Sequence, residues 1–227
     1  MITTDAKISL EKMISKTLGL FRIDVEKRVN WFPGMFLQLS LSRKSASEPW
    51  LDSKPFSIAS WGGQTIRIIV RKEGSFTTEL FSIGKEGSLG TIKYPLGSFY
   101  LNETENKVFL AGGAGISAFS GYLDYVYLKG VNNRSFLYYS TRSSAESLLS
   151  FYWGKIPDNI SVNENFTRDL VNGKMGKRLT IEDLRDDISE MNSYKYYVCG
   201  PPGFTKYWVD SLTNEKLKVR TESWLIS

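Results

Sequence analysis

The chain contains 227 residues, of which 41% are hydrophobic and 23% are charged, a composition typical of a folded protein with one large domain or two small ones. It has no histidine, which excludes a Ser-His-Asp triad, histidine-based acid–base catalysis and most zinc sites. Its single cysteine, Cys199, excludes an intrachain disulfide and a four-cysteine iron–sulfur cluster. A chain so poor in reactive side chains either binds a ligand without catalysis or uses the chemistry of a cofactor.

The excess of basic residues lies in the first part of the chain. Residues 1–101 hold 14 Lys/Arg and 9 Asp/Glu, whereas residues 102–227 hold 15 of each. The basic part either attracts phosphates or an acidic protein partner, or is an ordinary solvated surface. No Lys/Arg-rich run carries interleaved aromatic residues, so nucleic-acid binding is not expected. Without a long apolar segment or a secretory signal in the polar residues 1–11, we expect a cytoplasmic protein with no membrane span.

Apolar and polar residues alternate in the part of the chain that precedes Tyr100. The clearest runs cover residues 21–26, 35–42 and 66–71, and glycines and prolines separate them. Successive side chains of a strand point to opposite faces, so this alternation predicts half-buried strands. Short strands at this spacing are typical of a small antiparallel barrel or sandwich.

The pattern changes after about residue 102, where buried strands and helices are expected to alternate. Strands are predicted at residues 108–110, 135–139, 160–166, 196–198 and 219–225. Helices are predicted at residues 116–129, 145–153, 180–188 and 204–217. In the third helix Thr180 and Asp183 form a plausible capping box. Alternating strands and helices indicate a parallel sheet, and we expect a domain boundary that gives domains 1–102 and 103–227.

A glycine-rich turn lies between the first of these strands and the first helix. Its residues are Gly112, Gly113, Ala114, Gly115 and Ile116. With Ala118 the turn fits the dinucleotide fingerprint in its alanine-ended form, because glycines allow a pyrophosphate to approach backbone N–H groups at a helix start. The alternative is a simple helix entry.

The end of the second predicted strand lacks the acidic residue that holds the ribose of NAD. The residues there are Ser140, Thr141 and Arg142, and a guanidinium with two hydroxyl groups suits a 2′-phosphate. The sequence therefore predicts NADPH in preference to NADH. The alternative is that Arg142 is an exposed surface residue.

A second turn with glycine and proline follows the strand predicted at residues 196–198. It contains Cys199, Gly200, Pro201 and Pro202. The carboxyl ends of parallel strands are where ligands bind in such sheets, so Cys199 is a candidate for contact with the nicotinamide. The alternative is that this cysteine is a small buried apolar residue.

Six segments resemble, in the same order, those of the ferredoxin–NADP reductase superfamily: residues 54–60, 74–80, 95–97, 112–119, 199–203 and 222–224. The resemblance covers nearly the whole chain. It implies an antiparallel flavin-binding β-barrel followed by a Rossmann-like nucleotide-binding domain with a parallel sheet. It also implies an NAD(P)H-dependent flavoprotein reductase.

The resemblance assigns the flavin contacts of the first domain. In the family's motif an arginine pairs with the flavin phosphates, an aromatic ring stacks on the flavin, and a serine hydroxyl lies near the reactive nitrogen. The matching residues are Lys54, Phe56 and Ser57, with Pro55 between them. Lysine keeps the charge without the bidentate fork, and phenylalanine keeps the stacking face without the hydroxyl.

The resemblance also assigns a pyrophosphate-binding helix start and a C-terminal ring. The helix start contains Gly74, Ser75, Phe76 and Thr77. A helix N-terminus favours an anion, and a second phosphate makes FAD the expected flavin in place of FMN. At the C-terminus Glu222 matches the family's acid and Trp224 its flavin-shielding aromatic residue. The alternatives are a simple glycine-initiated helix and a tryptophan that closes the last strand.

The implied mechanism brings the nicotinamide and the flavin face to face, with Ser57, Cys199 and Glu222 lining the contact. The electron acceptor would be a separate acidic carrier of the ferredoxin or flavodoxin type. Two alternatives remain open. One is an electron-transfer subunit of a complex of the dihydroorotate dehydrogenase type, and the other is a non-catalytic nucleotide-binding protein that has lost its flavin.

Overall fold

The computed structural model describes residues 1–227 except 28, 63–64, 102–103, 153, 172–173 and 222–227. Contacts divide the chain into two compact units. The first unit comprises Met1–Leu101 and Ser117–Leu128, and the second comprises Asn102–Ile116 and Lys129–Ser227. Among the described residues, no helix is long and apolar enough to cross a membrane.

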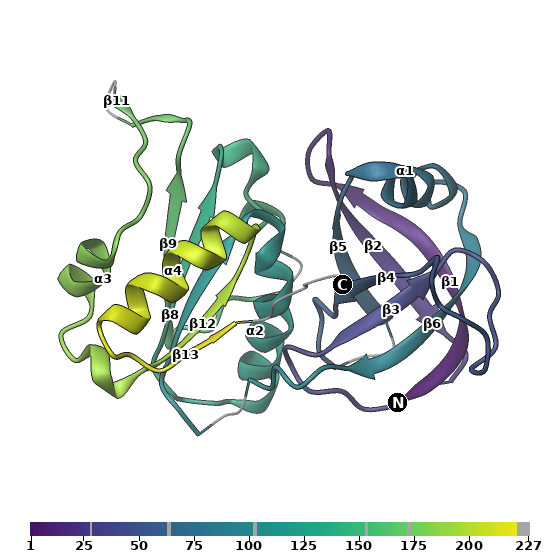
Figure 1. The fold of residues 1–227 in the computed structure, drawn as a ribbon, viewed down its shortest axis with the longest axis horizontal. Coiled ribbons are helices and arrows are strands. Elements are labelled where there is room, and N and C mark those ends of the chain that lie inside the picture. Colours follow the sequence, from purple (N-terminus) through teal and green to yellow (C-terminus); the bar gives the residue numbers. More distant parts are fainter. Residues whose placement is uncertain (28, 63–64, 102–103, 153, 172–173, 222–227) are drawn as a thin grey trace. The chain divides into compact units, whose positions relative to one another are not determined.

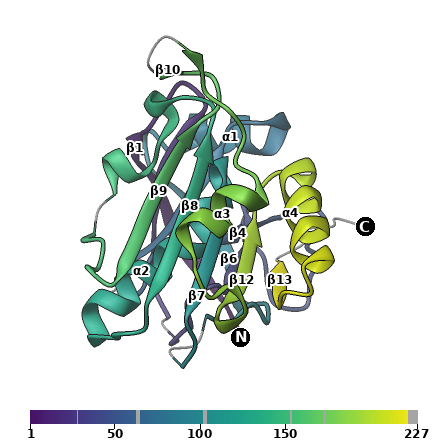
Figure 2. The same ribbon diagram turned by 90° about the vertical axis from the view of Figure 1, so that its left-hand side faces the viewer.

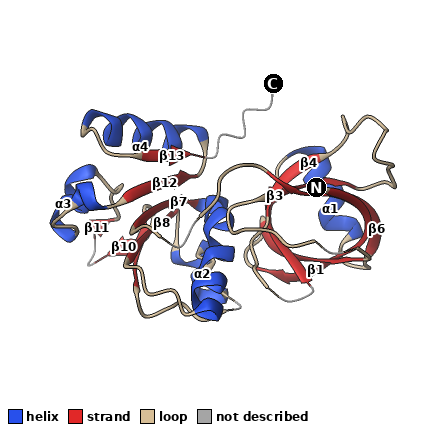
Figure 3. Cartoon of the chain, turned by 90° about the horizontal axis from the view of Figure 1, so that it is seen from below, coloured by secondary structure: helices blue, strands red, loops and turns tan. Residues whose placement is uncertain are grey.

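The first unit contains a six-stranded antiparallel sheet in the order β4-β3-β6-β1-β2-β5 (Figure 1). Its elements are β1 (Ile2–Met13), β2 (Leu18–Val25), β3 (Phe36–Ser40), β4 (Lys54–Ser57), β5 (Thr65–Arg71), β6 (Ser88–Leu96), helix α1 (Gly74–Ile83), which lies between β5 and β6 in the chain, and most of helix α2 (Ser117–Lys129). The sheet curls into a barrel (Figure 3). The edge strands approach each other where the backbone N–H of Ala59 donates to the carbonyl of Arg67 at 2.8 Å, so the barrel is nearly closed.

Alternation along the strands builds the core of the barrel. In β2, Phe21 and Ile23 are fully buried while Arg22 between them is exposed, as the sequence pattern predicts. Helix α1 covers one end of the barrel and contributes Leu80 and Phe81 to the same core. The rings of Phe21 and Phe81 meet edge to face with centroids 5.0 Å apart.

The second unit contains a five-stranded parallel sheet in the order β13-β12-β7-β8-β9. Its elements are β7 (Lys107–Gly112), β8 (Ser135–Thr141), β9 (Ile160–Phe166), β12 (Lys195–Cys199), β13 (Val219–Thr221), the hairpin β10 (Leu170–Val171) and β11 (Lys174–Met175), and helices α3 (Ile181–Asp187) and α4 (Pro202–Asn214). From β7 the chain proceeds outward through β8 to β9, and then returns to place β12 and β13 on the other side of β7. The resulting 3-2-1-4-5 order is that of a Rossmann-like sheet, with its topological switch point between β7 and β12.

Helices α3 and α4 lie against one face of this sheet (Figure 2). Leu184 of α3 and Trp208 and Leu212 of α4 pack in one core with alternate residues of β7, β8 and β12. Helix α3 begins at the predicted capping box, where the Asp183 carboxylate accepts from the backbone N–H of Thr180 at 2.8 Å. The fold class predicted from the sequence, a barrel followed by a parallel-sheet Rossmann-like domain, is confirmed.

The helix predicted at residues 145–153 is wrong for the described residues of this segment. Two 3₁₀ turns, Ser144–Glu146 and Leu149–Phe151, stand in its place. The hydroxyl of Ser147 accepts from the backbone N–H of Leu149 at 3.2 Å and bonds to the carboxylate of Glu164 in β9. Serine side chains that hydrogen-bond to nearby backbone compete with helix formation. This explains why residues 145–153 do not form the helix that their apolar spacing predicts.

We expect Trp208→Ala to lower the free energy of unfolding by about 3–5 kcal/mol, because Trp208 is only 1% exposed and its removal leaves a large cavity. Urea denaturation followed by circular dichroism measures the change. The neighbouring Tyr207, 43% exposed, supplies the control, and Tyr207→Ala should cost less than about 1 kcal/mol. Equal losses for the two variants would contradict the packing described for α4.

Candidate functional site

Two of the predicted motifs meet at the switch point of the parallel sheet. The glycine-rich turn follows β7, where Gly112 ends the strand and the 3₁₀ turn Gly113–Ile116 leads into α2. The second turn follows β12, which ends at Cys199. Cys199 pairs with Ala111 in the register of the two neighbouring strands, so both turns leave the sheet at the same edge.

Backbone contacts between the two turns require glycine. A Cβ atom on Gly115 would lie 2.2 Å from the carbonyl oxygen of Cys199 and 2.7 Å from the nitrogen of Gly200. A Cβ atom on Gly200 would in turn lie 2.6 Å from the ring of Phe204 and 3.1 Å from the Cα of Gly112. Gly113 has a positive φ of 54°, a conformation that favours glycine. The glycines therefore serve turn geometry and close packing, two of the roles that the dinucleotide fingerprint gives them.

The surroundings of this edge suit a dinucleotide. Pro202 occupies the first turn of α4 and the N-cap residue Pro201 supplies no side-chain cap, so backbone N–H groups of that turn lack a side-chain acceptor from the cap. Pro201 and Pro202 are exposed, whereas Cys199 is buried at 4% exposure. Helix starts of this kind attract anions, so the donor set fits a pyrophosphate.

Arg142 lies at the carboxyl end of β8, the strand beside β7. It is exposed, and Ser140 before it is half-buried. The hydroxyl of Thr141 donates to the carbonyl of Ser143 at 2.9 Å and so shapes the loop that begins at Arg142.

The end of the next strand brings a second arginine to the same place. The backbone N–H of Arg168 donates to the carbonyl of Arg142 at 2.7 Å, and Thr167 donates to the carbonyl of Thr141 at 3.0 Å. The carboxylate of Asp169 accepts from the backbone N–H of Ser144 at 2.7 Å. Both arginines are exposed, and within the described ranges neither forms an ion pair.

Sequence reasoning missed Arg168, although a signal for it was present. The strand at residues 160–166 was predicted with its observed bounds. Parallel strands end at one edge of a sheet, so residues 167–169 had to lie beside residues 141–143. The signal for Arg168 was therefore the shared edge at which the second and third predicted strands end.

In the first unit the structure brings together the two motifs assigned to the flavin. Lys54, Pro55, Phe56 and Ser57 form β4, which pairs only with β3 in the described sheet. Lys54 is exposed, Phe56 is half-buried and Ser57 is buried. The ring of Phe56 lies 6.2 Å from that of Phe76 in α1, tilted by 31°.

The start of α1 is exposed. Gly74 has a φ of 81°, and a Cβ atom added to it would meet no atom within 4 Å. The N-cap residue Glu73 makes no side-chain cap, and Ser75 is also exposed. The Thr77 hydroxyl accepts from the backbone N–H of Glu73 at 2.6 Å, which rigidifies this first turn. An open helix start beside an aromatic pair fits the phosphate and the ring of a flavin nucleotide.

Two predicted site residues, Glu222 and Trp224, lie outside the described residues. Strand β13 ends at Thr221 in the described chain.

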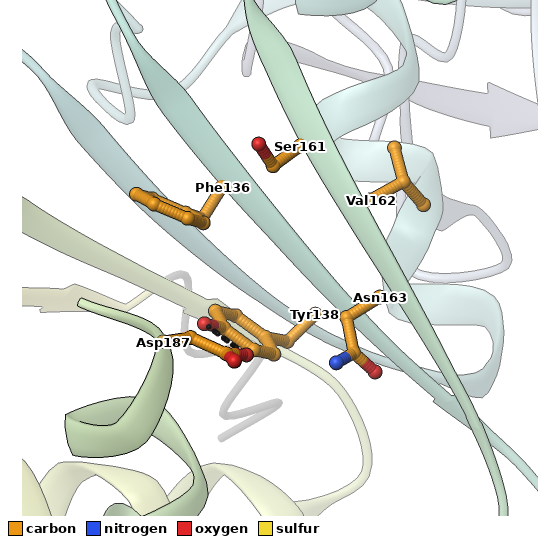
Figure 4. Close-up of a pocket in the computed structure, with 6 residues that line it drawn as sticks. All are labelled: Phe136, Tyr138, Ser161, Val162, Asn163 and Asp187. Carbon is orange, nitrogen blue, oxygen red and sulfur yellow. Dashed lines mark hydrogen bonds between the residues drawn. The ribbon is translucent and has the colours of Figure 1, made fainter.

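A separate hollow of about 220 Å³ is lined by residues of β8, β9 and α3, and none of these lining residues is a predicted site residue (Figure 4). Tyr138 points toward Asp187 of α3 and donates to its carboxylate at 3.0 Å. Burial and this neighbouring carboxylate raise the pKa of the Tyr138 hydroxyl far above its usual range, so it stays a neutral donor. The pair ties α3 to the sheet.

Comparison with known proteins supports the nucleotide-binding interpretation. A family model for the oxidoreductase NAD-binding domain matches residues 109–210. The chain is 26% identical to the anthranilate 1,2-dioxygenase electron transfer component of Acinetobacter baylyi, over 95% of this chain and 65% of that protein. It is also 26% identical to the probable dihydroorotate dehydrogenase B (NAD(+)) electron transfer subunit of Pyrococcus furiosus, over 96% of this chain and 79% of that protein. The chain thus spans somewhat less than two thirds of the dioxygenase relative.

Solved structures share the fold at lower sequence identity. The ferredoxin reductase in carbazole 1,9a-dioxygenase aligns over 99% of this chain and 70% of its own, with a TM-score of 0.79 and 18% identity. A ferredoxin NADP+ reductase from Neisseria gonorrhoeae, solved with bound FAD and NADP, aligns over 97% of this chain and 98% of its own, with a TM-score of 0.78 and 16% identity. These structures confirm the fold that the resemblance implies, and the family model matches the predicted nucleotide-binding part of the chain to oxidoreductases.

We expect Gly115→Ala to abolish measurable NADPH binding, because the new methyl group would collide with the backbone of the second turn and move the turn that is predicted to bind the pyrophosphate. Isothermal titration calorimetry measures the affinity. Gly203→Ala is the matched control, since its Cβ atom would meet nothing within 4 Å, and its affinity should stay within about twofold of wild type. Normal binding by Gly115→Ala would remove the turn from the site.

Proposed function

We propose that the chain is a member of the ferredoxin–NADP reductase superfamily, and that it takes hydride from NADPH onto a bound FAD and then passes electrons to a separate acceptor. The match to an oxidoreductase NAD-binding domain and the similarity to electron transfer components support this proposal. The observation that carries the proposal is the meeting of the two glycine turns at the switch point between β7 and β12. Dinucleotides bind at such switch points in open α/β sheets. The chain is assigned as a flavin-binding domain, residues 1–102, followed by a nucleotide-binding domain, residues 103–227.

The flavin contacts are proposed for β4 and α1. Lys54 supplies a positive charge for the phosphates, and the N–H groups at the start of α1 supply hydrogen-bond donors. Phe56 supplies a face for the isoalloxazine ring, and its contact with Phe76 fixes that face. A flavin bound there supplies the redox chemistry that this chain's side chains lack, accepting a hydride and releasing electrons.

The chain's own contribution to the reaction is binding and orientation. In this proposal the Ser57 hydroxyl would hydrogen-bond the edge of the flavin, and Cys199 would contact the nicotinamide. Glu222, which lies outside the described residues, is kept as a third candidate for that contact. Orientation accounts for most of the rate in such a transfer, because the two reacting atoms must come to about 3–3.5 Å. The protein therefore needs neither histidine nor any other strong base.

The preference for NADPH is proposed to rest on two arginines. Arg142 and Arg168 are joined through their backbones, so their side chains start from adjacent positions at one edge of the sheet. Two guanidinium groups suit a dianionic phosphate, and Ser140 adds a hydroxyl donor. No acidic residue ends β8, where an NAD-specific protein would bind the ribose.

The acceptor is proposed to be an acidic electron carrier of the ferredoxin or flavodoxin type, in the cytoplasm. The basic residues 1–101 favour such a partner. The similarity to a dihydroorotate dehydrogenase electron transfer subunit favours a second candidate, a subunit that passes electrons within a complex. Stable co-purification with a partner chain distinguishes the second candidate from the first.

The visible absorption spectrum of the purified protein, reconstituted with FAD, tests the proposal. Anaerobic NADPH should bleach the flavin band within the first turnover, and NADH should do so with a lower kcat/KM. A protein that stays colourless after incubation with FAD would overturn the proposed function and would leave a non-catalytic nucleotide-binding protein.

Replacing Ser57 by alanine should slow flavin reduction by about ten- to a hundredfold, because the transition state loses one aimed donor. The dissociation constant for NADPH should change little, since Ser57 lies in the flavin motif. Anaerobic stopped-flow absorbance, recorded over a range of NADPH concentrations, separates the two quantities. Ser47→Ala, on an exposed loop of the same unit, is the control. An unchanged reduction rate would reject the role of Ser57.

Arg142→Ala and Arg168→Ala should each lower kcat/KM for NADPH by about tenfold or more, the cost of one charged hydrogen bond to phosphate. The value for NADH should stay within about twofold, because NADH has no 2′-phosphate. Lys218→Ala, exposed just before β13, controls for the loss of one positive charge. Equal losses for both nucleotides would refute a 2′-phosphate site here.

A further inference from the structure

Helix α2 packs directly on the segment that follows the flavin motif. The motif ends at Ser57, and the next three residues, 58–60, are all buried. Gly121 of α2 faces this segment. A Cβ atom on Gly121 would lie 3.2 Å from the carbonyl oxygen of Ile58 and 3.2 Å from that of Ser60. The backbone of α2 therefore lies very close to residues 58–60, the segment that follows β4. Any residue other than glycine at position 121 would require a shift of a few tenths of an ångström.

A hydrogen-bond network fixes the same contact from the polar side. The carboxylate of Asp124, one helical turn after Gly121, accepts from the backbone N–H of Trp61 at 3.1 Å. The Trp61 indole donates to the carbonyl of Trp31 at 3.1 Å, and the Trp31 indole donates to the carbonyl of Ser60 at 2.9 Å. The ring of Trp61 also meets that of Tyr125 edge to face at 4.7 Å.

Hydrogen bonds also join residues 58–60 to the barrel. The backbone N–H of Ile58 donates to the carbonyl of Met35 at 2.9 Å, and the N–H of Ala59 donates to the carbonyl of Arg67 at 2.8 Å. The hydroxyl of Ser60 accepts from the N–H of Arg67 at 3.0 Å. The residues that follow Ser57 are therefore hydrogen-bonded to the barrel and packed closely against α2.

Helix α2 is also the continuation of the nucleotide turn. The 3₁₀ turn Gly113–Ile116 runs without a break into Ser117, the first residue of α2. Gly121 follows Gly115 by six residues and contacts the residue next to Ser57. The turn proposed to hold the nicotinamide dinucleotide is therefore continuous in the chain with the helix that packs on the segment after the flavin strand.

We propose that Gly121 and Asp124 are positioning residues for hydride transfer, setting the approach between the flavin strand and the helix that follows the nucleotide turn. The inference rests on the proposed function. Neither residue touches a reacting atom. Their effect follows from the steep dependence of a transfer reaction on distance, in which a displacement of about 1 Å can cost about a hundredfold in rate.

Gly121→Ala and Gly121→Leu test the steric half of the proposal. We expect the limiting rate of flavin reduction to fall about fivefold for alanine and about a hundredfold for leucine, as the added side chain moves the helix away. FAD content and the NADPH dissociation constant should stay within about twofold of wild type for Gly121→Ala, since neither binding motif changes. Alanine also favours helix more than glycine does, so a slower alanine variant cannot be explained by a weakened helix. Lys129→Ala, at the exposed end of α2, is the control.

Asp124→Asn and Asp124→Ala test the polar half with a readout that needs no flavin. Asparagine keeps an oxygen acceptor for the Trp61 N–H, and alanine removes it. Hydrogen exchange of the Trp61 backbone amide, followed by NMR, should be about tenfold faster in Asp124→Ala and near wild type in Asp124→Asn. Flavin reduction should follow the same order, with Asp124→Asn retaining most of the wild-type rate.

The outcomes separate this inference from the proposed function. A wild-type protein that binds no FAD would end both. A wild-type protein that NADPH reduces, together with Gly121→Leu and Asp124→Ala variants that fold, bind FAD and are reduced at the wild-type rate, would overturn the positioning role alone. If Gly121→Leu does not fold, Gly121→Ala decides, and a wild-type reduction rate in that variant overturns the proposal.

Discussion

The contact between two backbone turns is the constraint on which the second unit depends. Gly115 lies so close to the carbonyl of Cys199 that no side chain fits between them. The contact exists because β12 returns to the inner side of β7, opposite to the direction in which β8 and β9 were added. A switch in direction leaves an opening at the carboxyl ends of two neighbouring strands, and glycines at that opening expose the N–H groups of helix starts. The fold and the proposed binding chemistry therefore have the same origin.

The first unit also presents an exposed helix start, but beside an edge strand of an antiparallel sheet. Its curled antiparallel sheet leaves β4 at an edge, and α1 begins with an exposed turn at Gly74. The Phe56–Phe76 contact joins this strand to this helix, so a charged residue, an aromatic face and a helix start come from two short segments. Both units present helix N-termini, and this suits ligands that carry phosphates at several points. A chain without histidine can support redox chemistry in this way, since a cofactor supplies the reactivity.

Elements with strong local signals were predictable from the sequence. The strand at residues 160–166 and the capped start of α3 at Thr180 occur as predicted, because alternation and capping depend on neighbouring residues. The helix predicted at residues 145–153 failed where Ser147 bonds to its own backbone and to Glu164 of a distant strand. Arg168 was missed for a similar reason, since its place beside Arg142 is set by strand order and not by local pattern. Glycines were predicted as phosphate-binding residues, but the partner that each one approaches is visible only in three dimensions.

A crystal structure of the protein with FAD and NADP+ bound tests the central claim most directly. We expect the pyrophosphate of NADP+ against residues 113–116, with its 2′-phosphate within hydrogen-bond distance of Arg142 and Arg168. We also expect the flavin ring against Phe56, with the nicotinamide carbon and the flavin nitrogen about 3–3.5 Å apart in a reactive arrangement. Density for NADP+ elsewhere on the sheet, or a flavin and a nicotinamide in two unconnected pockets, would contradict that claim.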